Sequence, residues 1–539
     1  MHPTKHFPIL FVALLVCVHA GAGEAHGPRL ETGGHCMACH SGMTTPSGED
    51  ISIGSSWRAS MMGNSARDPY WQAAVRREVM DHPTSSAAIE DSCATCHMPM
   101  ARVHAAMRGA QASVFDNLAA APADPATSEL ARDGVSCGLC HQIRGDNFGA
   151  SSSFSGGFRI EAPPSASAAP VFGPFEVDRG RQRVMQSATD FVPTSSSHVQ
   201  QSEFCATCHT LYTHALNSAG EEIGRLPEQV PYLEWQHSEY RNARSCQDCH
   251  MPAVAGDAPI TSVLGQPRSG VSRHTFEGAN AYMLRMLNKY RGELGVTASS
   301  QELESAAGRT IEFLRTQSAQ LAVEATQVYA DRLSFDVVVR NLAGHKFPTA
   351  YPSRRAWLHV VARNAAGAIL FESGALQPDG SITGNANDSD PARFEPHYAR
   401  IERADEVQIY ESVMTDTAGR VTTGLLSAVR YVKDNRLLPQ GFEKASAGED
   451  IAVRGEALTD VDFQAGGDRV RYFLPIAQGL AAVTVTAELW FQPIGYRWAY
   501  NLRQYDTPET RRFVRYFEET STASAVLVAS ATASVRPVQ

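Results

Sequence analysis

Ten cysteines of this chain fall into five pairs with the same spacing, and a histidine directly follows each pair. The five segments are Cys36-Met-Ala-Cys39-His40, Cys93-Ala-Thr-Cys96-His97, Cys137-Gly-Leu-Cys140-His141, Cys205-Ala-Thr-Cys208-His209 and Cys246-Gln-Asp-Cys249-His250. The chain has eleven cysteines, and the remaining one, Cys17, lies in an apolar N-terminal segment. Beyond that segment no cysteine is left over for a structural disulfide.

The C-x-x-C-H pattern is the signature of c-type haem attachment. Two thiols form thioethers with the haem vinyl groups, and the adjacent histidine ligates the iron from below. The two-residue spacer lets both sulfurs reach the vinyls from one short helical turn. We therefore expect five covalent c-type haems, with the ten paired cysteines as attachment points and His40, His97, His141, His209 and His250 as proximal iron ligands.

Other uses of paired cysteines fit the pattern less well. Zinc sites and redox dithiols also use C-x-x-C, but neither needs a histidine after every pair. Disulfides in an exported protein need no fixed spacing. The five flat cofactors would also supply apolar mass to a segment rich in Gly, Pro, Ser and Ala, and would act as covalent staples. We expect the protein without haem not to fold.

Each iron has a second axial position that a histidine or a methionine can fill. Eleven histidines lie outside the motifs and the apolar N-terminal segment, enough for two histidines at every iron. The candidate distal ligands are His82, His104, His198, His274 and His345, with Met61 and Met62 as alternatives. The competing interpretation of each histidine is a surface or hydrogen-bonded side chain. His359 lies within a predicted strand and is expected to pack rather than ligate.

All five motifs lie before residue 251, and the pattern after about residue 320 changes to short alternating strands. We predict an α+β multidomain protein, with a mostly helical, loop-rich pentahaem cytochrome domain followed by an antiparallel β-sandwich. The expected segments are a signal peptide (1–22), the haem domain (23–290), a helical connector (291–320), the sandwich (321–500) and a C-terminal helix and tail (501–539). Ser299 and Glu302 predict a capping box at the start of the connector helix.

Composition and charge restrict the partners. The net charge is −10 and no basic nucleic-acid patch is visible, so an electrostatically steered redox partner should present a basic face. The N-terminal apolar run is too short to span a membrane and ends in small residues, which indicates a cleaved secretory signal and a periplasmic location. No later segment is long and apolar enough to span a membrane. Arg354 and Arg355 are candidates to pair with haem propionates, with surface exposure as the alternative.

The segments Ser202–Thr213 and Ser245–Pro252 resemble the haem domains of multihaem cytochromes of the cytochrome c-554 and hydroxylamine-oxidoreductase type. The later segment Gly344–Leu358 resembles the β domain of related exported multihaem proteins. The first resemblance covers only the haem-bearing half. It implies closely paired haems, mostly with two histidines per iron, in a periplasmic electron shuttle, and it favours His345 as an axial ligand from the second domain.

The expected function is electron transfer between redox partner proteins, chiefly other cytochromes. The alternative is an oxidoreductase that acts on a small nitrogen or sulfur compound at one open haem. Pentahaem nitrite reductases, which resemble this chain in haem number, replace one motif histidine with lysine. The chain contains no C-x-x-C-K segment, which argues against nitrite reduction.

Overall fold

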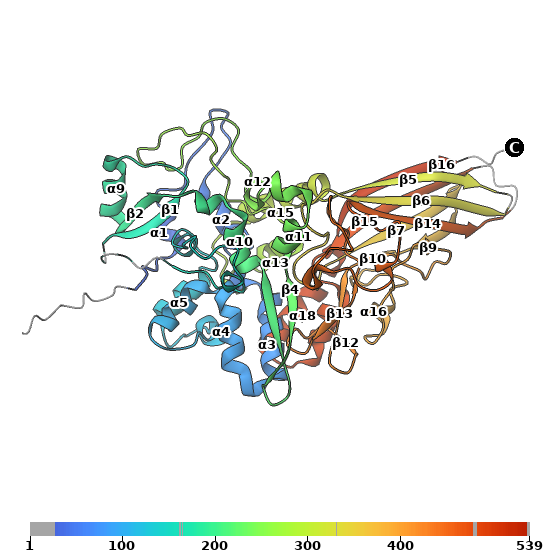
Figure 1. Ribbon diagram of the computed structural model, residues 1–539, viewed down its shortest axis with the longest axis horizontal. Coiled ribbons are helices and arrows are strands. Elements are labelled where there is room, and N and C mark those ends of the chain that lie inside the picture. The colour runs from blue at the N-terminus through green and yellow to red at the C-terminus, as the bar shows by residue number, and fades with distance from the viewer. Residues whose placement is uncertain are drawn as a thin grey trace, which may run out of the picture.

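The computed structural model describes residues 27–160, 163, 165, 167–329, 331–477 and 482–535. The predicted signal segment, residues 1–22, lies outside these ranges. The molecule is elongated, with a helical half at one end and a long β-sandwich at the other (Figure 1). None of the helices in the described ranges is both long and apolar enough to cross a membrane.

The helical half consists of short helices joined by long loops. Its helices are α1 (Gly33–Met37), α2 (Ile53–Arg58), α3 (Pro69–Asp81), α4 (Ser86–His97), α5 (Pro99–Met107), α6 (Val114–Leu118), α7 (Pro125–Arg132), α8 (Cys137–Cys140), α9 (Arg179–Thr189), α10 (Ser202–His209), α11 (Pro231–Gln236) and α12 (Cys246–His250). Two small sheets accompany them. Strand β1 (Ala169–Gly173) pairs parallel with β2 (Phe191–Ser195), and β3 (Leu211–Leu216) pairs antiparallel with β4 (Glu222–Gln229).

The motifs occupy short helices, as the two-residue spacer requires. Helices α4, α10 and α12 end at the motif histidine, while α8 consists of the third motif's Cys137–Cys140. The first motif begins in α1 and continues past its end. Helix α12 starts at a capping box, in which the Ser245 hydroxyl accepts the Asp248 N–H and the Asp248 carboxylate accepts the Ser245 N–H.

Three helices connect the two halves: α13 (Ala281–Lys289), α14 (Arg291–Leu294) and α15 (Ser300–Gln317). The capping box between Ser299 and Glu302 is present at the start of α15. Leu303 of α15 packs with α13 in a helical core, whereas Leu314, near the other end of α15, packs in the core of the sandwich. Helix α15 therefore belongs to both hydrophobic cores, which fixes the two halves against each other.

The sandwich is built from two main sheets whose inner faces share one core. The first sheet has the order β5 (Ala319–Val328), β6 (Arg332–Asn341), β14 (Gly467–Pro475) and β9 (Arg400–Ile401). The second has the order β10 (Ile409–Tyr410), β7 (Arg355–Asn364), β15 (Val483–Gln492) and β16 (Val526–Val535), and β8 (Ile369–Ser373) also pairs with β7. Pairing is antiparallel except between β14 and the two-residue β9. The structure thus has the predicted α+β organisation.

Buried and more exposed side chains alternate along β6, which gives this sheet one face toward the core. Leu333, Phe335, Val337 and Val339 are buried in the shared core, and the residues between them are more exposed.

His359 of β7 contacts Glu372 and Glu488 on neighbouring strands, at 3.0 and 2.9 Å. A third small sheet, β12 (Val421–Thr422), β11 (Ser412–Thr415) and β13 (Arg430–Asp434), extends the sandwich toward the helices.

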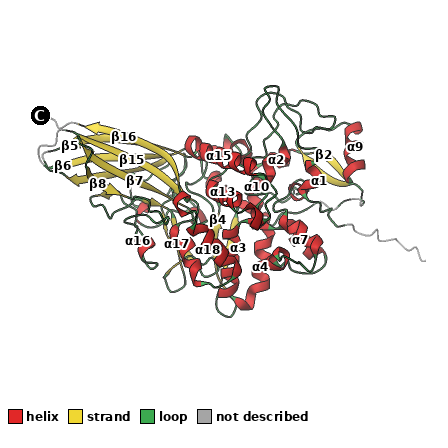
Figure 2. Cartoon of the chain, turned by 180° about the vertical axis from the view of Figure 1, so that it is seen from behind, coloured by secondary structure: helices red, strands yellow, loops and turns green. Residues whose placement is uncertain are grey.

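The C-terminal segment returns to both halves. After α16 (Ala386–Ser389) and α17 (Tyr496–Asn501), helix α18 (Pro508–Glu518) packs beside α3 of the helical half (Figure 2). Glu509 of α18 pairs with Arg76 of α3 at 2.9 Å, and Tyr516 stacks on Tyr290. The chain then crosses back, and β16 pairs with β15 along the sandwich. Residues 501–535 therefore contribute a helix to one half and a strand to the other.

Candidate functional site

One continuous cavity of about 1340 Å³ runs through the helical half, and every motif cysteine and motif histidine lines it. Protein interiors pack as densely as organic crystals, with few voids larger than a water molecule. A cavity of this size is incompatible with a chain that packs only against itself. The helical half therefore encloses a volume that a large bound group must fill.

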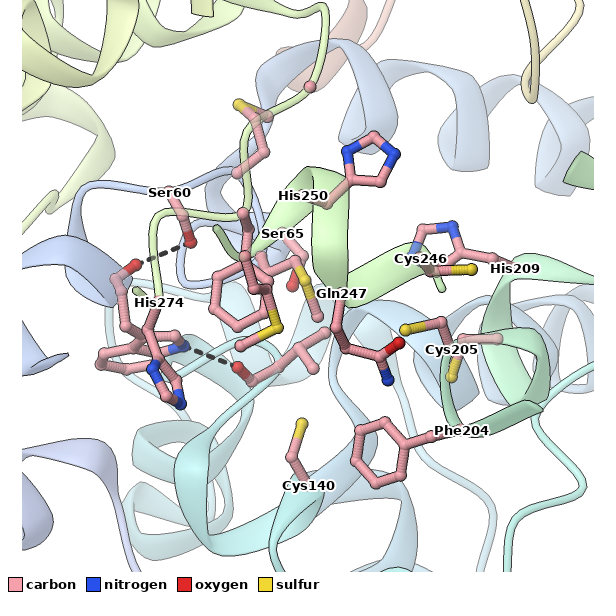
Figure 3. Close-up of a pocket in the computed structure, with 18 of the residues that line it drawn as sticks. Ser60, Ser65, Cys140, Phe204, Cys205, His209, Cys246, Gln247, His250 and His274 are labelled. Atoms are coloured by element: carbon pink, nitrogen blue, oxygen red, sulfur yellow. Dashed lines mark hydrogen bonds between the residues drawn. The ribbon is translucent and has the colours of Figure 1, made fainter. Parts of the chain in front are cut away.

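Thiols of different motifs meet inside this cavity. The thiol of Cys36 lies beside that of Cys137, the thiol of Cys96 beside that of Cys208, and the thiol of Cys205 beside that of Cys246. All ten cysteines are free thiols, so no disulfide accounts for these pairs. Figure 3 shows Cys205 and Cys246 side by side, with Cys140 across the cavity. Motif 1 therefore lies beside motif 3, and motif 4 lies beside both motif 2 and motif 5.

The motif histidines are oriented by backbone carbonyls. The Nδ1 atoms of His40, His141 and His250 lie 2.7, 2.6 and 2.5 Å from the carbonyl oxygens of Ile260, Phe172 and Glu277. An Nδ1–H that donates to a carbonyl leaves Nε2 unprotonated, which is the form that ligates a metal. Ile260 and Glu277 lie in loops of the helical half, whereas Phe172 lies in β1.

Burial keeps the imidazoles of His97, His141, His209 and His250 in their neutral form. Desolvation lowers the pKa of His97 and His250 to about 4, and it also lowers the pKa of His141 and His209. A protonated imidazole cannot ligate a metal, so a neutral side chain at physiological pH is the one that an iron requires.

Two predicted distal histidines lie opposite motif histidines. The ring centroids of His141 and His274 are 6.3 Å apart, and those of His250 and His345 are 6.2 Å apart. A metal–imidazole bond of about 2 Å on each side, plus roughly 1 Å from nitrogen to ring centroid, gives a separation of about 6 Å. Both spacings fit one iron between two imidazoles. The Nδ1 atoms of His274 and His345 lie 3.2 and 2.9 Å from the carbonyl oxygens of Ser272 and Lys346.

The other three predicted distal histidines do not line the cavity. His104 of α5 has its Nδ1 2.8 Å from the Thr127 hydroxyl of α7. Both ring nitrogens of His198 are engaged, one with the Ser196 hydroxyl and one with the Ile143 carbonyl. His82 is buried at the turn between α3 and α4, and neither of its nitrogens has a partner within the described residues.

A network of buried charges surrounds His345 at the junction of the two halves. Lys346, which is fully buried, pairs with Asp434 at 2.7 Å, and Arg436 pairs with the same carboxylate. Arg436 also contacts Glu234 of α11 at 2.9 Å, and Glu234 accepts the Lys346 N–H. Glu234 belongs to the helical half, and Lys346 and Arg436 belong to the sandwich half. The network therefore joins the two halves beside His345. Sequence reasoning missed it because its members are far apart in the chain.

The two adjacent arginines of the sandwich have different environments. Arg355 pairs with Asp388 within the sandwich and does not line the cavity. Arg354 lines the cavity near His209, and no carboxylate in the described ranges pairs with it. Burial lowers the pKa of Arg354 to about 10, which leaves the group charged at neutral pH. An unpaired guanidinium at the cavity wall suits an anionic group such as a haem propionate.

Acids and phenols gather beside the second motif. Glu78 of α3, Glu228 of β4, Tyr70 of α3 and Tyr351 all line the cavity, and both carboxyls lie close enough to Cys93 to affect its thiol. Burial raises the pKa of Glu228 to about 7 and also raises that of Glu78. Two N–H groups, of Leu425 and Leu426, hydrogen-bond to Glu78. No local sequence signal marks this cluster.

Comparison with known proteins finds one significant structural likeness to report. The crystal structure of a penta-heme cytochrome c552 from Thermochromatium tepidum is similar, with a TM-score of 0.52 and 16% sequence identity. The match covers 94% of this chain and 99% of that one, so it extends across both halves. At this identity the likeness shows a shared fold. No family model matches the chain, and no curated protein matches it significantly.

Proposed function

We propose that this protein is an exported multihaem c-type cytochrome that transfers electrons between redox partners through five covalently bound haems. One observation carries the proposal: five C-x-x-C-H motifs, far apart in sequence, line a single cavity too large to be empty. The ten paired cysteines would attach the haems, and His40, His97, His141, His209 and His250 would ligate the irons. The penta-heme cytochrome of similar fold supports the same function.

The haem irons supply reversible one-electron chemistry, and the protein's residues set where it happens. A continuous path from the first motif to the fifth is supported by the neighbouring thiols of motifs 1 and 3 and of motifs 4 and 5, and by Cys140 of motif 3, which lies within electrostatic range of Cys208 of motif 4. We assign His274 and His345 as the distal ligands opposite His141 and His250, on the basis of their spacing. His82, His104 and His198 stay candidates for the other irons, although none of them lines the cavity.

Export, a periplasmic location and redox partners that are themselves cytochromes are further parts of the proposal. They rest on the apolar N-terminal segment and on the attachment chemistry. Thioether formation needs reduced thiols that the protein does not consume in disulfides, and all ten are free.

Haem content tests the proposal directly. The intact mass of the purified protein should exceed the polypeptide mass by five haems, and the adducts should survive acid–acetone extraction. Replacement of Cys246 and Cys249 by serine should remove one haem and leave four. A protein that folds with no covalent haem would refute the proposal.

One observation favours the alternative, an oxidoreductase at an open iron. The part of the cavity beside the second motif carries Glu228 and Tyr351, groups able to move protons, and no second histidine of the described chain stacks opposite His97. Carbon monoxide separates the two functions, because it binds only a reduced iron with a free position. Binding at one haem would favour the oxidoreductase, and five six-coordinate irons would exclude it.

A further inference from the structure

Helix α9 lies at the end of the helical half that is farthest from the sandwich (Figures 1 and 2). Val184 of α9 lines the cavity and is 42% exposed. Across from it, Val263 and Leu264 line the cavity and are 42% and 62% exposed. These three apolar side chains therefore face both the cavity and the solvent.

This opening lies between the segments that hold the first and third motifs. The carbonyl of Phe172 in β1, the strand before α9, contacts Nδ1 of His141. The carbonyl of Ile260, just before the exposed loop, contacts Nδ1 of His40. Arg181 of α9 donates to the carbonyl of Leu264 at 2.8 Å and so joins the two sides of the opening.

Helix α9 is basic on a protein that is acidic as a whole. Its eleven residues include Arg179, Arg181 and Arg183 and no carboxylate, whereas the net charge of the chain is −10. Asp178 caps the helix and pairs with Arg181. Arg179 and Arg183 are exposed, and neither has a carboxylate partner among the residues that the structure describes.

Haem propionates do not account for these two arginines. Arg181 and Arg268 line the cavity, where a haem propionate would lie. Arg179 and Arg183 are not part of the cavity wall and project from the exposed helix. Their charges are therefore available to a molecule that approaches from outside.

We propose that this rim, made of Arg179, Arg183, Val184, Val263 and Leu264, is the docking surface for an electron-transfer protein whose redox centre is surrounded by carboxylates. The inference rests on the proposed function. Apolar side chains framed by charges are the anatomy of a transient protein interface. Each encounter would pass one electron, so the partner is oxidised by one electron and this protein is reduced by one.

The charge close to the rim determines how a partner protein is attracted there, although the whole molecule is acidic. Screening limits exposed charges to a range of about 8 Å at physiological ionic strength. Of the carboxylates that flank α9, Asp178 pairs with Arg181 and Asp190 pairs with Arg29, which leaves Glu176. At contact distance a partner therefore experiences Arg179 and Arg183 against this one carboxylate, rather than the net charge of −10. This reverses the expectation from overall charge, which called for a partner with a basic face.

The test uses the full-length haem-loaded protein and two probe donors. Stopped-flow kinetics would follow its reduction by a photoreduced plant-type [2Fe–2S] ferredoxin, a small acidic protein, and by photoreduced free riboflavin. The variant is the double substitution Arg179→Glu/Arg183→Glu. We expect the second-order rate with ferredoxin to fall at least about tenfold at low salt, the lower end of electrostatic steering effects. The rate with riboflavin should stay the same.

The matched control is Arg332→Glu/Arg340→Glu, which reverses two exposed charges on β6 of the sandwich and changes the net charge equally. It should keep at least about half of the wild-type rate with ferredoxin, because a distant charge is screened. Equal losses in both double variants, or no loss in the α9 variant, would overturn the proposal. Covalent haem is measured in every sample, so a failure of the proposed function is seen separately as missing haem.

Discussion

The buried carboxylate of Asp434 offers the sharpest test of how the two halves are held together. Its side chain contacts both Lys346 and Arg436, and all three residues are less than one-tenth exposed. The change Asp434→Asn keeps the shape but leaves two buried cations without this carboxylate. Removing one partner of a buried ion pair costs about 3–5 kcal/mol. Against a typical unfolding free energy of roughly 5–15 kcal/mol, this loss is large.

The pH dependence has a defined sign. The cations beside Asp434 hold its pKa well below the usual range, while the unfolded carboxyl titrates near about 4. A carboxylate with a lowered folded-state pKa adds stability above the unfolded value, and this contribution is lost as the pH falls toward the folded value. The difference between wild type and Asp434→Asn should therefore be full at pH 7 and shrink below about pH 4.

Guanidinium unfolding, followed by far-UV circular dichroism, measures the effect. Asp405→Asn is the control, because Asp405 pairs with Arg403 on the surface and both side chains are more than two-thirds exposed. An exposed pair contributes about 0.2–1 kcal/mol, so this variant should stay close to wild type. A loss of less than about 1 kcal/mol for Asp434→Asn would refute the role given to the network.

Three further outcomes are expected. Replacing His345 with alanine should convert one low-spin iron to high spin in electron paramagnetic resonance, whereas His359→Gln should change no iron; an unchanged spectrum for the first variant would contradict its assignment as a ligand. Phe335→Ala should lower the unfolding free energy by about 3–5 kcal/mol, because Phe335 is fully buried and stacks on Tyr472. The pKa of Glu228 is raised to about 7, so ionisation of this side chain should lower the stability of the folded protein as the pH rises from about 4 to 7. In Glu228→Gln the melting temperature should therefore depend less on pH across that range.

Short-range patterns in the sequence predicted several elements correctly. The capping box at Ser299 and Glu302 starts α15, and the alternation around Phe335 forms a strand with one buried face. These features depend on residues within one or two turns of each other, so local chemistry is enough to define them. The path of the C-terminal segment is different, because α18 packs on α3 while β16 pairs with β15. Only contacts with distant segments decide which half each element joins.

Some residues of the candidate site could likewise be predicted from the sequence, whereas others are brought together only by the fold. The ten cysteines and five motif histidines could be identified from spacing alone, since attachment chemistry acts within five consecutive residues. His274 and His345 were two of five distal candidates, and only the folded chain places them about 6 Å from a motif histidine. The cluster around Glu228 had no sequence signal, because its members come from separate elements. The arginines of α9 are neighbours in the sequence, but only the folded chain places α9 beside Leu264.

The sequence by itself therefore predicted the groups for covalent haem attachment, because these groups are neighbours along the chain. The tertiary structure decided which motifs are adjacent, which imidazoles face each other and where the cavity meets solvent. Those properties depend on distances between residues that the chain brings together only when hydrophobic burial and the buried charges at Asp434 fix its two halves in place.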